Sequence, residues 1–401
     1  MEFYVVIGGG LTGLTAANAL ADAGHRVRLV EQAHAVGGRA QTQQHGEYRM
    51  NLGPHALYCG GIAMKTFRNW KLPFSGNFPP AEGRSYFVRE NKLYPAVRDV
   101  KSLLTTRLFS LGEKLEAARV FSAFSRASAE DGETMQQWID RHAQSEHVRE
   151  FAATITRIAT YTTDMDRLSA KAAVEQIAMA VRHNVHYLDG GWQTLVDGLR
   201  ERATRLGVEI RCGEHLTSLD HLDADGIVLA VGPASVQKLT GKQVPNQQPL
   251  RMATLDIGIR KLPKGAAHVA FGLDRPLYFS VHSRSARLAP EGAALAHVAK
   301  YMDNIQADPK ALREELEEYA SLVMPGWQRE AEAVRFLPNL TVTPMMVTPE
   351  GRPDVDFLGL DNLTVAGDWV GAEGMLADTA VASALKAASL IQKQKSNVLV
   401  A

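Results

Sequence analysis

The sequence has only two cysteines, Cys59 and Cys212, among its 401 residues. They lie far apart and outside any C-x-x-C spacing, so they predict neither a disulfide framework nor a zinc site, and we expect no bound metal. Scarce cysteine is typical of a reducing compartment, so we expect a cytoplasmic protein. The N-terminus has no basic region followed by a cleavage site, so we expect no signal peptide.

The chain also lacks a charge excess, because 44 Lys and Arg residues balance 44 Asp and Glu residues. This balance argues against a general nucleic-acid-binding protein, which needs extra cations to neutralise phosphates. No apolar run reaches the ~18 residues of a membrane span, so we expect no integral membrane segment, whereas peripheral membrane contact stays open. The hydrophobic fraction of 45% and the chain length predict a globular protein of two or three domains.

The first thirty residues predict one βαβ unit. Residues 3–7 form an apolar run typical of a strand buried on both faces. A glycine-rich turn follows, then an Ala- and Leu-rich helix over 14–23 and a second apolar run that ends at Glu31. The right-handed crossover rule makes the two strands parallel neighbours in one sheet.

Other regions indicate a second layer system. Residues 103–186 carry apolar side chains at three- and four-residue spacings, which predicts helices, one of them with a capping box at Thr134. Residues 250–301 contain short apolar runs between Gly and Pro turns, which predicts a mostly antiparallel sheet. Strands are expected again at 207–210, 225–232 and 363–366, and a last helix at 377–392.

The glycine-rich turn matches a dinucleotide-binding fingerprint. Gly8, Gly10 and Gly13 keep the G-x-G-x-x-G spacing between a strand and a helix, and Glu31 ends the second strand. The glycines let the backbone approach a pyrophosphate at the helix N-terminus, while Glu31 would bind the ribose hydroxyls. This fingerprint alone does not distinguish NAD from FAD.

Further motifs point to FAD. Gly37-Gly38-Arg39 resembles the extended fingerprint of the flavin-containing amine oxidase, protoporphyrinogen oxidase and phytoene desaturase superfamily, in which the Arg reaches the FAD pyrophosphate. Residues 51–55 resemble its flavin-proximal segment, which usually has Asp where this chain has Asn51. Residues 187–192 are similar to its central glycine pair, and residues 366–376 to its terminal FAD motif.

The resemblance implies non-covalently bound FAD. Asp368 would bind the ribityl and phosphate region, and amides around Met375 and Leu376 would face flavin N1 and O2. Leu216 would clamp the adenine through its backbone. The complete expected set of FAD contacts is Gly8, Gly10, Leu11, Thr12, Gly13, Glu31, Gln32, Gly38, Arg39, Gly53, Pro54, His55, Leu216, Gly367, Asp368, Met375 and Leu376.

Three residues in these motifs are candidates for the substrate pocket, namely His55, Tyr187 and Trp369. His55 either orients substrate or is a structural histidine bonded to backbone. Trp369 is interpreted as a wall of an apolar pocket, with half of an aromatic cage for an amine as the alternative. No catalytic triad stands out, and none is needed, because the isoalloxazine itself accepts the hydride.

The resemblance implies an α/β fold in which a Rossmann-like FAD-binding domain carries an inserted α+β substrate domain. The FAD-binding domain is expected to be discontinuous, because the two terminal motifs must meet around one cofactor. It would comprise residues 1–60, 188–236 and 345–401. Residues 61–187 and 237–344 would form the substrate-binding domain.

We therefore expect an FAD-dependent oxidoreductase that oxidises or desaturates a hydrophobic small molecule by hydride transfer to flavin N5. The Gly-Pro-His and Ala-Gly-Asp-Trp forms resemble the phytoene-desaturase-related branch most closely. Two alternatives stay open: an amine oxidase that uses O2, and a non-catalytic binding protein like the GDP-dissociation inhibitors, which share this fold. The sequence predicts neither the substrate itself, nor the electron acceptor, nor the oligomeric state.

Overall fold

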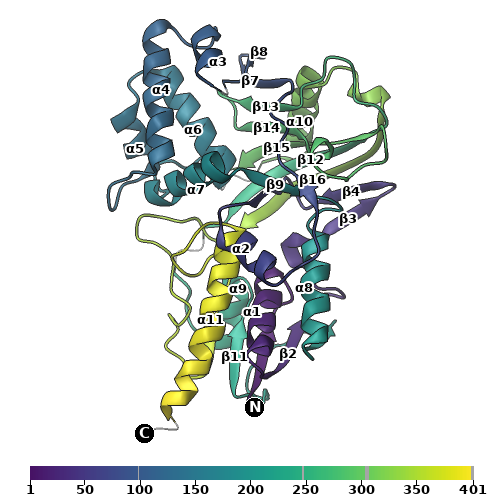
Figure 1. The fold of residues 1–401 in the computed structure, drawn as a ribbon, viewed down its shortest axis with the longest axis vertical. Coiled ribbons are helices and arrows are strands. Elements are labelled where there is room, and N and C mark those ends of the chain that lie inside the picture. The colour runs from purple at the N-terminus through teal and green to yellow at the C-terminus, as the bar shows by residue number, and fades with distance from the viewer. Residues whose placement is uncertain (98, 246–247, 303–306, 399–401) are drawn as a thin grey trace.

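The structure is a computed structural model that describes residues 1–97, 99–245, 248–302 and 307–398. A parallel sheet with its helices forms the end of the molecule that carries both termini, and a larger sheet and a group of helices form the other end (Figure 1). The α/β fold class expected from the sequence is confirmed.

The parallel sheet combines strands from the beginning, the middle and the end of the chain. Each pair of neighbouring strands is parallel, and Val6 on the central strand lies opposite Leu29 on one side and Val228 on the other. The carboxyl ends of all these strands therefore meet at one edge. The strand order is β10 (Glu209–Cys212), β2 (Arg26–Glu31), β1 (Phe3–Ile7), β11 (Gly226–Leu229) and β17 (Leu363–Val365).

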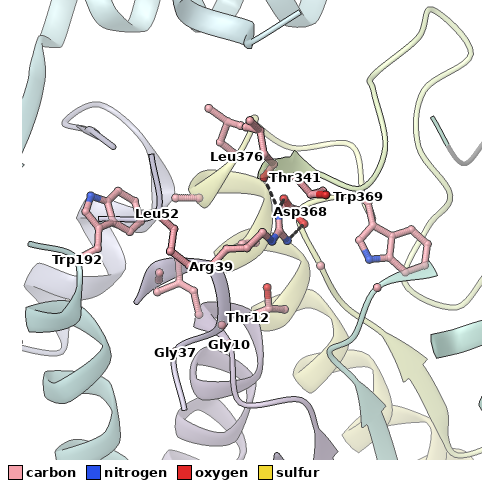
Figure 2. A pocket seen from close by; sticks show the side chains of 18 of the residues that line it. Gly10, Thr12, Gly37, Arg39, Leu52, Trp192, Thr341, Asp368, Trp369 and Leu376 are labelled. Atoms are coloured by element: carbon pink, nitrogen blue, oxygen red, sulfur yellow. Dashed lines mark hydrogen bonds and ion pairs between the residues drawn. The ribbon is translucent and has the colours of Figure 1, made fainter. Parts of the chain in front are cut away.

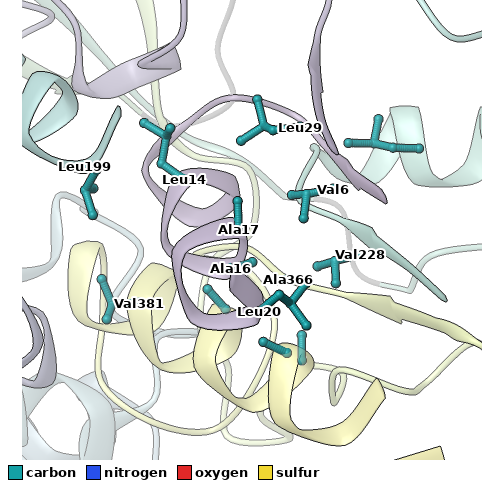
Figure 3. Close-up of a cluster of buried hydrophobic side chains, with 14 of the residues drawn as sticks. Val6, Leu14, Ala16, Ala17, Leu20, Leu29, Leu199, Val228, Ala366 and Val381 are labelled. Carbon is teal, nitrogen blue, oxygen red and sulfur yellow. The ribbon is translucent and has the colours of Figure 1, made fainter. Parts of the chain in front are cut away.

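Helix α1 (Leu11–Asp22) is the centre of the first hydrophobic core. It packs against α11 (Ala377–Val398) and α8 (Gln193–Arg205) as well as against the sheet. Its fully buried residues include Leu14, Ala17 and Leu20, which Figure 3 shows among side chains of the neighbouring strands and helices. The small alanines let the helix lie close to its neighbours, which is typical of a βαβ unit that carries a dinucleotide fingerprint.

The second sheet has seven strands and is mostly antiparallel, as predicted for residues 250–301. Only the β13–β7 pair is parallel. Helix α10 (Pro309–Val323) packs against β12, β14, β15 and β16. The strand order is β16 (Ala331–Thr343), β12 (Leu250–Ile259), β15 (Ala294–Met302), β14 (Leu277–Val281), β13 (Val269–Gly272), β7 (Ser85–Arg89) and β8 (Lys92–Pro95).

The predicted helical insert is confirmed, and it has a core of its own. Trp138 stacks on Phe124 with ring centroids 4.6 Å apart, and both are fully buried. The capping box predicted at Thr134 is present. The Thr134 hydroxyl oxygen accepts from the Gln137 N–H, and the Gln137 side-chain oxygen accepts from the Thr134 N–H. The helices are α3 (Val100–Thr105), α4 (Leu111–Arg126), α5 (Met135–His142), α6 (Glu146–Thr160) and α7 (Ala170–His183).

Short elements join the two ends of the molecule. Ala63, Met64 and Phe67 of α2 are buried in the first core, beside α11, although residues 61–187 were assigned to the substrate domain. The domain boundaries themselves stay a prediction. The remaining elements are α2 (Ile62–Asn69), β3 (Thr42–His45), β4 (Tyr48–Asn51), β5 (Leu57–Tyr58), β6 (Gly76–Asn77), β9 (Val185–Leu188), α9 (Pro233–Thr240) and the 3₁₀ turns Gly38–Ala40, His282–Arg284 and Trp327–Arg329.

A buried ionic network fixes the second sheet to the β3–β4 hairpin. Asp256 on β12 accepts from Arg335 Nε at 2.9 Å and lies 2.6 Å from Nδ1 of His297, and all three side chains are buried. Burial opposes ionisation of Asp256, but His297 and Arg335 outweigh it and hold its pKa below the ordinary value. Arg335 also donates to the carbonyl oxygens of Met50 and Asn51. The network therefore positions the segment that leads into the candidate site.

We expect Gly13→Ala to destabilise the apoprotein by about 2 kcal/mol, because a Cβ at this position would overlap with the Gly8 carbonyl oxygen. Helix propensity alone would make the Ala variant more stable by ~1 kcal/mol. A decrease in the free energy of unfolding would therefore be evidence for the steric overlap. The free energy of unfolding in urea is the measurement. Gly10→Ala is the matched control, since its Cβ would meet no atom within 4 Å. Equal stability of the two variants would contradict the proposed packing.

Candidate active site

A cavity of about 480 Å³ lies at the carboxyl edge of the parallel sheet. Strand β1 is flanked by β2 on one side and by β11 on the other. The carboxyl end of β1 is therefore the topological switch point, where open α/β sheets bind ligands. The lining extends from there to β12, β16 and the end of α6. It comprises Gly8, Gly10, Leu11, Thr12, Glu31, Gln32, Gly37, Gly38, Arg39, Ala40, Leu52, Pro54, His55, Ala56, Tyr58, Tyr161, Trp192, Ala230, Val231, Gly232, Ser235, Met252, Leu340, Thr341, Val342, Gly367, Asp368, Trp369, Leu376, Ala377, Asp378 and Ala380.

The first turn after β1 has the form of an anion cradle. A Cβ on Gly10 would project into open space, and α1 has no side-chain cap at its N-terminus and no acid in its first turn. Its first N–H groups are therefore available to a phosphate. Glu31 is held at the end of β2, where its carboxylate accepts from the Gly9 N–H at 2.6 Å and the Ala33 N–H at 2.7 Å.

Arg39 and Asp368 bring the N-terminal and C-terminal motifs together. The two guanidinium nitrogens of Arg39 donate to the two carboxylate oxygens of Asp368 at 2.6 and 2.7 Å, a bidentate pair seen in Figure 2. Burial would lower the pKa of Arg39, but the adjacent Asp368 carboxylate raises it above the ordinary value. Arg39 therefore stays charged beside the glycine-rich turn, as a pyrophosphate requires.

The segment before α11 is fixed by a second arginine, the half-buried Arg352. Arg352 donates to the carbonyl oxygens of Gly371 and Gly374, each at 2.7 Å. Burial lowers the pKa of Arg352 to about 10, so it remains a cation at neutral pH. Leu376 follows with a left-handed φ of 55° and leads into the first turn of α11. The α11 N-terminus consequently faces the cavity.

Asp378 is a cavity residue that the sequence reasoning missed. Its side chain is 3% exposed, and one carboxylate oxygen accepts from the Ala63 N–H at 2.8 Å, in the first turn of α2. Gly61, which begins that helix, supplies no cap, so Asp378 caps α2 from a distant part of the chain. Burial raises the pKa of Asp378 to about 6. An acid in the first turn of the last predicted helix was the available signal.

The other end of the cavity is aliphatic and aromatic. Leu52, Met252 and Leu340 line it together with Tyr58 and Tyr161. The Tyr161 hydroxyl donates to the Pro54 carbonyl oxygen at 3.1 Å, and burial raises the pKa of Tyr58 to about 12. These hydroxyls are therefore neutral donors. Tyr161 lies at the C-cap of α6 and belongs to no motif, so no sequence signal identified it.

His55 lines the cavity and makes the backbone contact expected of a structural histidine. Its Nδ1 lies 3.0 Å from the Gly53 carbonyl oxygen, and its ring packs 5.0 Å from that of Trp192. Burial lowers the pKa of His55 to about 4, so the ring is neutral at physiological pH. Asn51 stands where the superfamily motif usually has Asp. Its side-chain oxygen still provides a hydrogen-bond acceptor, and it accepts from the backbone N–H of Trp192 at 3.0 Å.

Tyr187 and Trp369, the other two expected substrate residues, differ in their position relative to the cavity. Tyr187 does not line the cavity, and its ring packs 4.6 Å from that of His282. Trp369 lines the cavity, but its indole donates to the Val231 carbonyl oxygen at 3.1 Å and points away from Arg39 (Figure 2). The position of Tyr187 lends no support to a substrate role, whereas Trp369 lines the cavity and its substrate role stays a prediction.

Most of the expected FAD contacts lie together. The cavity lining includes Gly8, Gly10, Leu11, Thr12, Glu31, Gln32, Gly38, Arg39, Pro54, His55, Gly367, Asp368 and Leu376. Leu216 is partly buried against the first core instead. The lining also omits Gly13, Gly53 and Met375. Within the described ranges, no cluster of three His, Cys, Asp or Glu side chains could hold a metal ion.

Comparisons with known proteins identify the family. The profile described as flavin containing amine oxidoreductase matches residues 11–244. The chain is 24% identical over 253 residues to the 4,4'-diaponeurosporene oxygenase of Staphylococcus aureus, covering 54% of this chain and 50% of that protein. This chain belongs to the flavin-containing amine oxidoreductase family, and the expected superfamily membership is confirmed.

Solved structures share the fold. An oxidoreductase from Methanosarcina mazei has a TM-score of 0.76 at 18% identity, with 97% of this chain and 100% of that chain covered. A putrescine oxidase variant has a TM-score of 0.77 at 15% identity, with 98% and 99% covered. The chain spans from a fifth to a half of the length of curated relatives that it matches. Over the described part of the chain, no helix is long and apolar enough to cross a membrane.

The residues present fit the family's cofactor, FAD. The open space at Gly10, the uncapped start of α1 and the charged Arg39 suit a pyrophosphate, and Glu31 suits a ribose. Cys59 and Cys212 are free thiols, and neither lines the cavity. Non-covalent binding, as expected from the sequence, is compatible with this arrangement.

Replacing Arg39 with Ala should weaken FAD binding by about 1.5–3 kcal/mol, or about 10- to 150-fold in Kd. The loss would have two sources: the cation that attracts the pyrophosphate is removed, and the buried Asp368 carboxylate, which would repel the phosphates, loses its Arg39 partner. Titration of apoprotein with FAD measures it. Arg260→Ala is the control, since Arg260 forms an exposed pair with Glu330 away from the cavity. An unchanged Kd for the Arg39 variant would exclude this role.

Asp378 should make the stability of the apoprotein fall as pH rises. The carboxyl group binds its proton more tightly in the folded state, because its pKa rises from 3.8 to about 6 on folding. Its contribution to the free energy of unfolding is therefore fully present below pH 3.8 and is lost as the pH rises through 6. Asp378→Asn keeps an oxygen acceptor for Ala63 but cannot ionise. Relative to wild type, this variant should gain up to about 3 kcal/mol between about pH 4 and pH 7.

Unfolding in urea across this pH range measures the difference. Asp354→Asn is the control, because the Lys386 ammonium lowers the pKa of Asp354 in an exposed ion pair. This variant should lose stability relative to wild type as the pH rises, which is the opposite of the change expected for Asp378→Asn. A pH-independent difference between wild type and the Asp378 variant would show that Asp378 stays ionised.

Proposed function

We propose that this chain is an FAD-dependent oxidoreductase that oxidises or desaturates a hydrophobic small molecule at a carbon centre. One observation carries the proposal: a single cavity joins the dinucleotide turn to an end lined by Leu52, Tyr58, Tyr161, Met252 and Leu340. A substrate at that end would lie next to the cofactor, at an interface between the two sheets, as is common for ligand sites. A cytoplasmic location belongs to this proposal as well.

The chain's own residues would bind and orient the reactants. Bound FAD supplies the acceptor for a hydride. Arg39 and Asp368 would hold its polar linker, while the N-terminus of α11 offers N–H groups to negative charge that develops nearby. Tyr58 and Tyr161 would position the substrate and exclude water, and their high pKa values keep them from supplying charge.

The lining favours a hydrophobic substrate over a polycation. Among the lining residues, the acids Glu31 and Asp368 lie at the dinucleotide end and already accept from protein donors. The remaining lining acid is Asp378, whose raised pKa makes ionisation costly. A polycation needs several fixed carboxylates, so this end suits an apolar molecule better.

Asp378 is nevertheless the observation that favours amine oxidation as the second candidate. Its carboxyl lies close enough to Tyr58 to raise the pKa of that hydroxyl. Above pH 6 the carboxylate would attract a single ammonium group beside the two tyrosines. Oxidation of an amine would then depend on Asp378 and on pH, whereas oxidation of an apolar substrate would not.

Anaerobic reduction of the bound flavin tests both candidates. We would mix the FAD-loaded protein with an isoprenoid polyene in detergent, a primary amine, a diamine and an L-amino acid, and follow loss of the oxidised flavin spectrum. Bleaching by the polyene alone supports the proposal, and bleaching by an amine supports the second candidate. Failure of every substrate, with FAD fully bound and reducible by dithionite, would favour a non-catalytic binding protein.

With the substrate that bleaches the flavin, Tyr161→Ala should slow substrate-dependent reduction at least about tenfold, because the lost ring opens the pocket and loosens substrate orientation. FAD content should be unchanged, since Tyr161 lies at the other end of the cavity. Tyr161→Phe is the matched control: it keeps the ring and removes only the bond to Pro54, so a change of about fivefold or less is expected. Normal reduction by the alanine variant would place the substrate elsewhere.

A further inference from the structure

A group of buried tyrosine and histidine side chains lies beside the cavity but does not line it. Tyr278 on β14 belongs to the same apolar cluster as Met252, which is a cavity residue. The Tyr278 hydroxyl lies 3.4 Å from Nε2 of His282, and the His282 ring centroid lies 4.3 Å from that of His297 on β15. Tyr278, His282 and His297 are 7%, 2% and 0% exposed. Polar groups at this depth need hydrogen-bond partners within the protein.

Asp256 fixes the direction of the hydrogen bonds in this group. Its pKa lies below the ordinary value, because the bonds to His297 and Arg335 outweigh the opposing effect of burial, so it is an ionised acceptor. His297 therefore donates to it from Nδ1, at 2.6 Å from Asp256 Oδ1. Arg335 already neutralises the carboxylate. A neutral His297 leaves this buried network without net charge, and its Nε2 is then an acceptor.

His282 and His297 carry complementary ring nitrogens. Nδ1 of His282 and Nε2 of His297 are both buried, and neither atom has a hydrogen-bond partner among the residues that the structure describes. Since the two rings are in contact, one arrangement satisfies both atoms, with a donor on Nδ1 of His282 and the acceptor on Nε2 of His297. A small ring rotation or one bridging water molecule would form this bond.

The same reasoning orders the tyrosines. With its proton on Nδ1, His282 accepts at Nε2 from the Tyr278 hydroxyl. Tyr278 has a single proton to donate, so Tyr187, whose side chain is also bonded to Tyr278, donates to the Tyr278 oxygen. Burial raises the pKa of both tyrosines, so both keep their protons. The bonds therefore run in one direction, from Tyr187 through Tyr278, His282 and His297 to Asp256.

Tyr187 is the outer end of this chain of bonds. Its side chain is partly exposed, whereas the other four side chains are buried. It lies on β9, where the two ends of the molecule meet (Figure 1). A proton from solvent can enter here, and each hydrogen then shifts to the next acceptor. The result is one added proton on the pair of His297 and Asp256, with both tyrosines still neutral.

The inner end lies within reach of charge in the cavity. His55 lines the cavity and interacts electrostatically with His297 and Asp256. Asp256 also lies four residues from Met252 on β12, and the alternation of side chains places both on one face of the strand. Negative charge added in the cavity would therefore favour protonation of His297. The titratable and charged groups that face the two histidines are His55, Asp256, Arg335, Tyr187 and Tyr278.

We propose that Tyr187, Tyr278, His282, His297 and Asp256 form a proton relay that neutralises the charge gained by FAD on reduction. Transfer of a hydride gives the cofactor two electrons and one proton, and so adds one negative charge. The relay would bring one further proton from solvent to His297, which becomes an imidazolium ion paired with Asp256. The electron donor is the substrate or, in a test, a chemical reductant. The proposal applies to any substrate and requires only that FAD binds.

Nitrogen NMR of the FAD-loaded wild-type protein tests the direction of the relay. With ¹⁵N-labelled histidine at about pH 6, we expect both His282 and His297 to carry their proton on Nδ1 while FAD is oxidised. Anaerobic reduction with dithionite should then add a proton to Nε2 of His297. A proton on Nε2 of His282 in the oxidised protein, or an unchanged His297 after reduction, would overturn the proposal.

The slope of the midpoint potential of bound FAD against pH counts the protons taken up per two electrons. We expect wild type to take up more protons than His297→Asn between about pH 5 and pH 8, by up to about one, because Asn keeps a donor for Asp256 but cannot be protonated. His142→Asn is the matched control, since His142 is a partly buried histidine in the helical insert, and it should match wild type. Equal slopes for wild type and the His297 variant would contradict charge compensation.

Tyr278→Phe distinguishes a relay from an electrostatic effect alone. The variant keeps the ring in its apolar cluster but removes the hydroxyl that links Tyr187 to His282. The ring-nitrogen protons of His282 and His297 should then exchange with D2O at least about tenfold more slowly than in wild type. FAD content and thermal unfolding would show that the variant folds. Exchange as fast as in wild type would mean that protons reach the histidines by another path, and the relay would be refuted.

Discussion

The shared direction of the strands in the parallel sheet is the constraint on which the site depends. Strands β1, β2, β11 and β17 come from three separate stretches of the chain, yet all of them end at one edge. The glycine-rich turn after β1, Glu31 after β2 and Asp368 after β17 must therefore meet there. This one geometric fact brings together the three turns that are expected to bind the dinucleotide.

Two ionic contacts, one partly exposed and one buried, connect distant parts of the chain and differ in role. Arg39 and Asp368 are separated by 329 residues in the sequence and pair at the cavity. Asp256, His297 and Arg335 lie in the second sheet and clamp the carbonyl oxygens of Met50 and Asn51. The first contact suits binding of the dinucleotide, whereas the second fixes the position of the segment expected to lie near the flavin.

The substrate end of the cavity follows from packing rather than from a motif. Tyr161 comes from the end of α6, Met252 from β12 and Leu340 from β16, and these elements meet only in the folded chain. Asp378 adds an ionisable carboxyl group, and burial raises its pKa to about 6. The substrate end of the pocket is consequently hydrophobic, with one carboxyl group whose charge depends on pH. Apolar molecules and amines are therefore the two candidate substrate classes.

Local sequence patterns were enough to predict the βαβ unit, the helical region and the antiparallel runs, and the motifs that bring Gly10, Glu31, Arg39 and Asp368 to one cavity. Those features depend on local spacing and turn chemistry, which the chain carries in short segments. Three features could not be predicted from such patterns: Tyr161 and Asp378 line the cavity, Tyr187 packs on His282, and the Trp369 indole donates to the Val231 carbonyl oxygen. Side-chain direction at a shared pocket depends on how distant elements pack, and no local pattern in the sequence records that packing.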